Sequence, residues 1–292
     1  MQGRMRDMLD YPIVDSHLHI WDLSRLRYRW LDQIPTLNKT CLMKEFDAAR
    51  GAYAVDKIVF MQAECSHEQY MDEVQFVEEV AQEDARLKAI VAWAPMEVEG
   101  ENLRALEQLA ARPLVKGIRR LIQTEDSGSF CRIPALIQAL RRLPELGLTF
   151  DLGIHTGQFY DVVRLAEACP ETRFVVDHLG KPDIRGGRLA EWKDEMRTIC
   201  QCENVWCKVS SLATEADHHH WTLEEVRPYA EWAFECFGFR RVMFGGDWPV
   251  SSQAASYPIC VDTLLTILQG ATEAEKRAFF RENAEQFYGI SG

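Results

Sequence analysis

The sequence has no long apolar run and no excess of basic residues. Nothing in its 292 residues approaches the ~20 consecutive apolar residues that cross a bilayer, and the N-terminal residues lack the apolar core of a signal peptide. The formal net charge of −12 opposes binding to nucleic acid or to an anionic membrane, because both require a basic surface. We therefore expect a cytoplasmic protein that binds neither.

The negative charge also bears on the substrate. A negative field gives no electrostatic steering to a polyanion, is indifferent to a neutral molecule and favours departure of an anionic product. Local arginines can override this tendency at a binding site. The charge therefore favours a neutral small molecule as substrate.

A regular cysteine framework is missing as well. The nine cysteines, an odd number, are scattered, and most stand beside apolar residues. We expect buried thiols in a reducing compartment. Cys200, Cys202 and Cys207 lie close together but have no paired knuckle elsewhere, so we expect no structural zinc there.

No linker or low-complexity segment interrupts the chain, and segments with strand character alternate with segments of helical spacing. Strands are expected from residue 13 and at 57–63, 89–94, 115–120, 148–154, 173–178, 205–210 and 241–247. Helices are expected at 70–84, 101–111, 134–143, 160–169, 189–200, 222–237, 257–268 and 272–288. An open doubly wound sheet also alternates, but eight strands are the count that closes a barrel. We predict an α/β fold, a single (β/α)8 TIM-barrel domain over residues 1–292.

The first strand carries polar residues at every second position. Asp15, His17 and His19 should share one face of a regular strand, whereas Ile13 and Val14 indicate that the strand is covered on both sides. Two imidazoles at this spacing can hold a divalent cation or hydrogen-bond one substrate oxygen. Satisfied core histidines would look the same, so the rest of the chain must decide.

Other polar residues fall at the carboxyl ends of the predicted strands, where barrels of this kind place catalytic groups. Such a gathering at one end of eight strands is improbable by chance. The residues are His17, His19, Gln62, Glu64, Arg119, Arg120, Asp151, His155, Gln158, His178, Lys181, Lys208, Ser210 and Asp247.

Asp247 follows two glycines, which permit close approach of the backbone at a strand end. A carboxylate at this place can activate water as a general base or bind a metal, and the histidines favour these roles over a turn cap. Arg119 and Arg120 alternate in facing, so one should enter the barrel mouth while the other pairs with acids beneath the helices. Lys208, in mid-strand, should form a buried ion pair with Asp151 or Asp177.

The remaining histidines and the loop aromatics are less telling. The run 218–220 should lie in a solvated loop, and His67 should lie at the surface. His155 either touches substrate or caps the loop after the fifth strand. Trp21 and Trp30, in the loop after the first strand, either cover a pocket or pack over the barrel mouth.

Five segments of the chain, in this order, resemble the amidohydrolase-related lactonase family: DSHLHIWD, KGIRRLIQ, DHLGKPDI, VWCKVSSL and RVMFGGDWPV. That family includes sugar lactonases acting on fuconolactone and rhamnonolactone, and the pyrone-dicarboxylate and muconolactone hydrolases. The similarity runs from about Tyr11 to Tyr288. It implies a (β/α)8 fold and hydrolysis of the ester bond of a lactone.

The resemblance also implies roles for individual residues. The catalytic and metal-ligating set falls on His17, His19, His178 and Asp247, with Asp247 as general base. Substrate contacts fall on Arg119, Trp21, Trp30 and Gln158, and we add Gln62, Glu64 and His155 as further candidates. The predicted fifth strand ends without the bridging lysine or glutamate of dinuclear relatives, which leaves one cation or none.

Two versions of the chemistry remain open at this point. Either the three histidines donate hydrogen bonds to the developing oxyanion, or they and Asp247 hold one zinc or manganese ion. Only one of Arg119 and Arg120 should reach the mouth, whereas a dicarboxylate needs several arginines, so a neutral aldonolactone such as L-fuconolactone or L-rhamnonolactone fits better. The alternatives are a metal-dependent decarboxylase of the same superfamily and a non-catalytic sugar-acid-binding barrel. The sequence leaves open whether the chain forms a homo-oligomer.

Overall fold

A computed structural model describes residues 9–290. Its eight strands form one parallel sheet in the order of the sequence. The strands are β1 (Ile13–Leu18), β2 (Val55–Met61), β3 (Leu87–Ala92), β4 (Val115–Leu121), β5 (Thr149–Gly153), β6 (Phe174–Val176), β7 (Val205–Val209) and β8 (Val242–Phe244). The predicted (β/α)8 barrel is confirmed.

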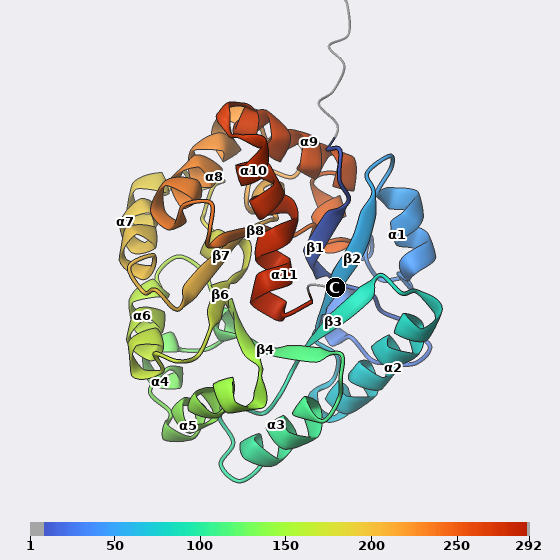
Figure 1. Cartoon of the computed structure of the whole chain (residues 1–292), viewed down its shortest axis with the longest axis vertical. Coiled ribbons are helices and arrows are strands. Elements are labelled where there is room, and N and C mark those ends of the chain that lie inside the picture. The colour runs from blue at the N-terminus through green and yellow to red at the C-terminus, as the bar shows by residue number, and fades with distance from the viewer. Residues whose placement is uncertain (1–8, 291–292) are drawn as a thin grey trace, which may run out of the picture.

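Helices surround the barrel in the order of the chain (Figure 1). They are α1 (Met43–Ala49), α2 (Tyr70–Glu83), α3 (Asn102–Ala110), α4 (Ser127–Phe130), α5 (Pro134–Arg142), α6 (Phe159–Ala168), α7 (Leu189–Ile199), α8 (Leu223–Phe237), α9 (Tyr257–Ile267), α10 (Glu273–Arg277) and α11 (Asn283–Tyr288). The capping boxes at Thr222 and Thr272 form, each with a glutamate three residues later. Pro134 opens α5, as its fixed φ favours.

The barrel closes where β1 meets the segment that follows β8. The His19 amide donates to the Trp248 carbonyl at 2.8 Å, and the Asp247 amide donates to the His17 carbonyl at 2.7 Å. Further down, the Ser16 hydroxyl donates to the Phe244 carbonyl at 2.6 Å. Closure therefore brings residues 17–19 and 247, from opposite ends of the sequence, to the same rim.

A bulge in β1 corrects one prediction. Between Asp15 and Leu18 the pairing with β2 slips by one residue, which reverses the facing of the side chains on either side. Asp15 thus points out of the barrel, where its carboxylate accepts from the Gly246 amide at 2.8 Å and lies beside Tyr257 of α9. The expectation that Asp15 shares a face with His17 is wrong because the alternation is interrupted.

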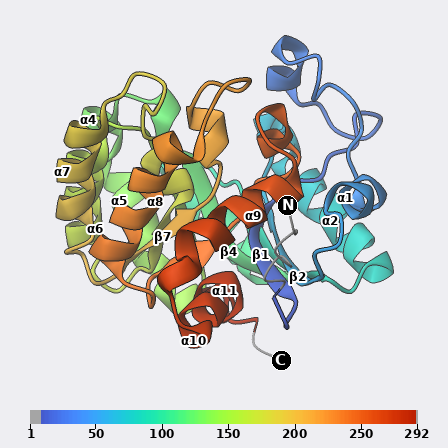
Figure 2. The same ribbon diagram turned by 90° about the horizontal axis from the view of Figure 1, so that it is seen from above.

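The opposite end of the barrel is closed by α11, which crosses the ring of strands in Figure 1 and lies away from the loops after β1 in Figure 2. Phe287 and Tyr288 pack with Val14, Val59 and other apolar side chains inside the barrel. The Lys57 ammonium, at the start of β2, donates to the Ile290 carbonyl at 3.0 Å. The amino-terminal end is therefore filled, and the carboxyl-terminal end remains for a site.

The predicted final helix at 272–288 is divided. A π-helical turn at Ala278–Glu282 separates α10 from α11. Phe279 and Phe280 are both fully buried, and both rings pack against Phe244. A π turn changes the angular spacing of neighbouring residues, which lets two consecutive rings reach the barrel wall.

Two further observations concern membrane-spanning helices and the cysteines. Within residues 9–290, no helix combines the length and the apolar character that crossing a membrane requires. The nine cysteines are free thiols, of which Cys41, Cys65, Cys131, Cys169 and Cys207 are buried.

Glu73 of α2 generates a prediction about pH. Its carboxyl group is 1% exposed, accepts a hydrogen bond from the Ala63 amide, and burial raises its pKa from 4.5 to about 8. The folded state then holds a proton that the unfolded state has released, so stability falls as pH rises from about 4.5 to 8. Glu73→Gln should flatten the slope of unfolding free energy against pH by up to about 1.4 kcal/mol per unit.

Chemical denaturation at several pH values between 5 and 8 measures this slope. Glu83→Gln, at the exposed end of the same helix, is the matched control and should keep the wild-type slope. Parallel curves for Glu73→Gln and the wild type would contradict the prediction.

Candidate active site

A cavity of about 470 Å³ opens at the carboxyl ends of the strands. His19, Arg119, His178 and Asp247 contribute to its lining, together with Trp30. The four polar residues are almost fully buried, so the cavity ends on ionisable groups held within the protein. Cavities of this size suit small molecules.

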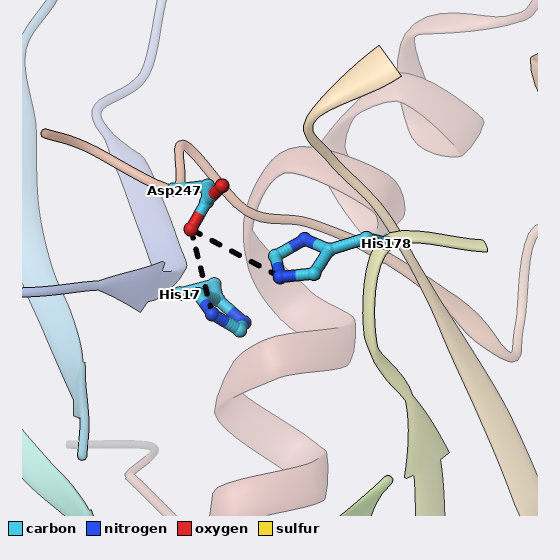
Figure 3. Close-up of side chains that lie close together, drawn as sticks. All are labelled: His17, His178 and Asp247. Carbon is cyan, nitrogen blue, oxygen red and sulfur yellow. Dashed lines mark ion pairs between the residues drawn. The ribbon is translucent and has the colours of Figure 1, made fainter. Parts of the chain in front are cut away.

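One carboxylate oxygen is the centre of the site. Oδ1 of Asp247 lies 3.3 Å from Nε2 of His19, 3.7 Å from Nε2 of His17 and 3.9 Å from Nε2 of His178. Figure 3 shows two of these contacts, with His17 on β1, His178 after β6 and Asp247 on the segment after β8. The structure thus brings together the four residues that the sequence placed in one catalytic set.

The other ring nitrogen of each histidine has its own partner. Nδ1 of His19 lies 2.8 Å from the Met61 carbonyl, and Nδ1 of His178 lies 2.8 Å from the Ser210 hydroxyl. A carbonyl oxygen can only accept, so Nδ1 of His19 carries a proton that it donates to Met61. Partners of this kind orient imidazoles that bind metals or substrates.

The charge states follow from burial and neighbours. Burial lowers the pKa of His17 well below its ordinary value and that of His178 to about 4, which favours neutral rings. Burial would raise the pKa of Asp247, but the facing imidazoles of His178, His19 and His17 hold it well below its ordinary value. The Ser211 hydroxyl donates to Oδ2 of Asp247, which leaves Oδ1 facing the histidines.

The donor set fits one divalent cation. His17, His178 and Asp247 can each offer a ligand atom, and these atoms lie within 4.8 Å of one another. Nε2 of His17 is buried and has no hydrogen-bond partner. Two imidazoles and a carboxylate that converge this closely need protons or a cation between them, and nitrogen and oxygen ligands suit zinc.

Strained backbone marks the same rim. Among residues 9–290, six non-glycine residues have positive φ: Glu64, His178, Leu179, Lys181, Ser211 and Asp247. All except Leu179 line the cavity. Such conformations cost of order 1–3 kcal/mol each and cluster at functional sites.

Gly245 shows why this rim needs a small residue. A Cβ on Gly245 would lie 2.8 Å from Cβ of His17, closer than real contacts allow. The close backbone approach predicted at the two glycines is thus confirmed, and it sets the distance between β1 and Asp247.

A buried ion network lies below the site. Nζ of Lys208 is 2.6 Å from Oδ2 of Asp151 and 3.0 Å from Oδ1 of Asp177, and these three side chains are fully buried. Asp177 also contacts Nδ1 of His17 at 3.2 Å and Nε of Arg119 at 2.7 Å. The predicted lysine ion pair is confirmed, with both of the candidate acids.

The two arginines divide as expected. Arg119 lines the cavity, whereas Arg120 pairs with Glu97 at 2.6 Å and lies over the Trp93 ring. The prediction that only one of them enters the mouth is confirmed.

Four predicted substrate contacts do not line the cavity. Trp21 is fully buried, donates to the Lys39 carbonyl and packs edge-on against Trp30. The Gln62 amide is engaged with Glu64 at both of its polar atoms. The first-loop aromatics thus divide: Trp30 covers the pocket, and Trp21 packs behind it.

The side chains of Gln158 and His155 form hydrogen bonds with loop backbone. The Gln158 amide donates to the Ile122 and Glu125 carbonyls and accepts from the His155 amide. His155 is exposed, with Nδ1 at 2.7 Å from the Thr156 carbonyl. His155 thus contacts Thr156 and Gln158 of its own loop and does not line the cavity, which agrees with the loop-capping alternative.

Other cavity residues were missed or misplaced. Ser211 lies one position beyond the predicted Ser210, and the turn after β7 brings both serines to the site. Glu215 and His218 also line the cavity, so the prediction of a solvated loop fails for His218, although His219 and His220 are exposed. His67 is exposed as predicted.

Comparison with known proteins agrees with this geometry. The model of a family described as amidohydrolase matches residues 14–290. The chain belongs to the amidohydrolase family. It is 29% identical to L-fucono-1,5-lactonase of Burkholderia multivorans, over 95% of this chain and 96% of that protein. It is 23% identical to L-rhamnono-gamma-lactonase of Scheffersomyces stipitis, over 97% of this chain and all of that protein.

A solved structure of this family is also similar. The zinc-bound crystal structure of an amidohydrolase from Burkholderia multivorans superposes with a TM-score of 0.86 at 27% identity, covering 96% of this chain and 99% of that one. The chain therefore has the fold of this family. At the carboxyl ends of its strands it also has a set of side chains suited to one cation.

The ion network below the site generates a prediction about stability. Lys208→Met removes the cation shared by Asp151 and Asp177 and leaves two buried carboxylates without it. Breaking a buried pair in this way costs about 3–5 kcal/mol. Denaturant unfolding should show this loss, whereas Lys44→Met, exposed on α1, should stay within about 0.5 kcal/mol of the wild type. A Lys208→Met protein as stable as the wild type would contradict it.

Proposed function

We propose that this amidohydrolase hydrolyses the ester bond of a lactone. The observation that carries the proposal is the ionised Asp247 carboxylate, facing three imidazoles in a small-molecule cavity. A positioned base beside polarising groups is what water attack on a carbonyl requires. The two lactonase relatives support the same reaction class.

In the proposed mechanism, Asp247 is the general base. Its carboxylate, which accepts from the Ser211 hydroxyl at Oδ2, takes a proton from a water molecule, and that water attacks the lactone carbonyl. The tetrahedral oxyanion collapses with cleavage of the ring C–O bond, and the proton on Asp247 passes to the departing alkoxide. The product is an open-chain hydroxy acid.

We propose that His17, His178 and Asp247 hold one divalent cation, zinc or manganese, with His19 beside them. When bound, that cation supplies positive charge for the carbonyl oxygen and lowers the pKa of water. His19 is oriented by the hydrogen bond from its Nδ1 to the Met61 carbonyl, and its Nε2 faces Oδ1 of Asp247. The chain's own contribution is to orient these nitrogens and to exclude bulk water.

The substrate class that we propose is a neutral, sugar-derived aldonolactone such as L-fuconolactone or L-rhamnonolactone. Nε of Arg119 donates to Asp177 at 2.7 Å and Nη1 donates to the Gln62 carbonyl at 3.5 Å, so neither fork of this guanidinium is wholly free for a substrate carboxylate. Glu64, whose pKa is lowered by His67, Gln62 and Arg119, adds negative charge to the wall of the cavity.

A panel of aldonolactones, assayed with a pH indicator, tests the reaction. The wild type should release acid from at least one neutral sugar lactone, and Asp247→Asn should lower kcat by about 10³-fold or more because the base is gone. Release of carbon dioxide from an acidic substrate, with no acid from any lactone, would favour a decarboxylase instead.

Metal removal tests the cation. Exhaustive dialysis against a chelator should abolish most of the hydrolysis, and adding zinc or manganese should restore it. The unfolding temperature before and after dialysis controls for loss of fold, and metal analysis counts the bound ion. Full activity of metal-free protein would exclude the metal-dependent mechanism and leave the histidines as direct hydrogen-bond donors.

A further inference from the structure

Glu64 is a partly buried carboxylate that has no role in the proposed hydrolytic mechanism. It follows β2, lines the cavity and has a left-handed backbone with φ of 54°. Its side chain is 26% exposed, which is enough for contact with a ligand in the cavity. Left-handed backbone is rare for glutamate, so the surrounding structure must enforce this placement.

Gln62 provides that enforcement. Its side-chain amide donates to Oε1 of Glu64 at 2.6 Å, and its side-chain oxygen accepts from the Glu64 backbone amide at 2.7 Å. Both polar side-chain atoms of Gln62 therefore form hydrogen bonds with Glu64. One oxygen of the Glu64 carboxylate is thus held by Gln62, and the other, Oε2, lies 3.7 Å from Nε2 of His67.

The neighbourhood keeps this carboxylate charged. Burial opposes ionisation, but His67, Gln62 and Arg119 together lower the pKa of Glu64. An ionised carboxylate is an acceptor only, and O–H donors bind it through short, charge-assisted hydrogen bonds. It repels other anions.

Trp30 stands beside Glu64 on the same wall. The indole Nε1 donates to the Ala63 carbonyl at 2.8 Å, which fixes the ring, and the ring remains partly exposed. Trp30 and Glu64 also line an adjoining cavity of about 320 Å³. A fixed aromatic face next to a carboxylate matches a molecule that has C–H groups on one side and hydroxyl groups at its edge.

We propose that Glu64, held by Gln62, is the specificity-determining residue that accepts hydrogen bonds from the ring hydroxyls of a polyhydroxy lactone seated against Trp30. This inference rests on the proposed function. It gives a chemical reason for the proposed preference for neutral sugar lactones. Oε2 of Glu64 accepts hydrogen bonds from hydroxyl donors, and its negative charge repels substrate carboxylates.

The test compares two lactones with the same five-membered ring. L-Rhamnono-γ-lactone carries hydroxyl groups, and γ-butyrolactone carries none. Glu64→Gln should lower kcat/KM for L-rhamnono-γ-lactone by about 10- to 100-fold, mainly through KM, and leave γ-butyrolactone within about twofold. The ratio of the two values, measured on one preparation, cancels any loss of folded protein.

Glu83→Gln is the matched control. It removes the same charge at the exposed end of α2, and Glu83 lines neither of the two cavities. Its ratio should equal that of the wild type. If Glu64→Gln does not fold, Glu64→Asn takes its place, because asparagine tolerates left-handed backbone.

An unchanged ratio in Glu64→Gln, or an equal loss for both lactones, would overturn the inference. If the wild type opens neither lactone, the hydrolase proposal fails separately, and calorimetric titration with L-rhamnono-γ-lactone then decides. Binding at least tenfold weaker in Glu64→Gln than in the wild type supports the assignment. Equal binding, or none to either protein, refutes it.

Discussion

The closure of the barrel between β1 and the segment after β8 is the constraint on which the site depends. Two backbone hydrogen bonds, from His19 to Trp248 and from Asp247 to His17, hold the segments together at the rim. The carboxylate and two of its facing imidazoles are thus placed by the same bonds that complete the sheet. A shift along this seam would change every distance around Oδ1 of Asp247.

The bulge in β1 and the small residue at Gly245 serve this closure. The bulge turns Asp15 outward to accept the Gly246 amide, so that His17 and His19 can both face inward. Below them, Asp177 contacts His17, Arg119 and Lys208. Lys208 also pairs with Asp151, which accepts a hydrogen bond from the Tyr288 hydroxyl at 2.6 Å. Buried polar side chains in contact with one another therefore run from the capping helix α11 to the site.

Periodicity accounts for what could be predicted from the sequence. Alternation of strand and helix patterns gave the barrel, and strand ends gave His17, His19, His178, Arg119 and Asp247. Prediction from periodicity failed where the backbone departs from regular strand geometry. A bulge is invisible in the pattern of β1, and the left-handed turn at Ser211 placed a second serine at the site beyond the predicted Ser210.

The position of several predicted substrate contacts outside the cavity has a related cause. Residue type shows that Gln62, Gln158 and Trp21 can form hydrogen bonds or stack, but not whether the protein already uses those groups. In the fold, each has protein partners: Glu64, the loop carbonyls after β4, and the Lys39 carbonyl. Because the protein satisfies the polar groups of these side chains, Glu64 and Trp30 are the residues left positioned at the cavity. Residues that support a binding wall can therefore be distinguished from residues that form it only once the hydrogen bonds are known.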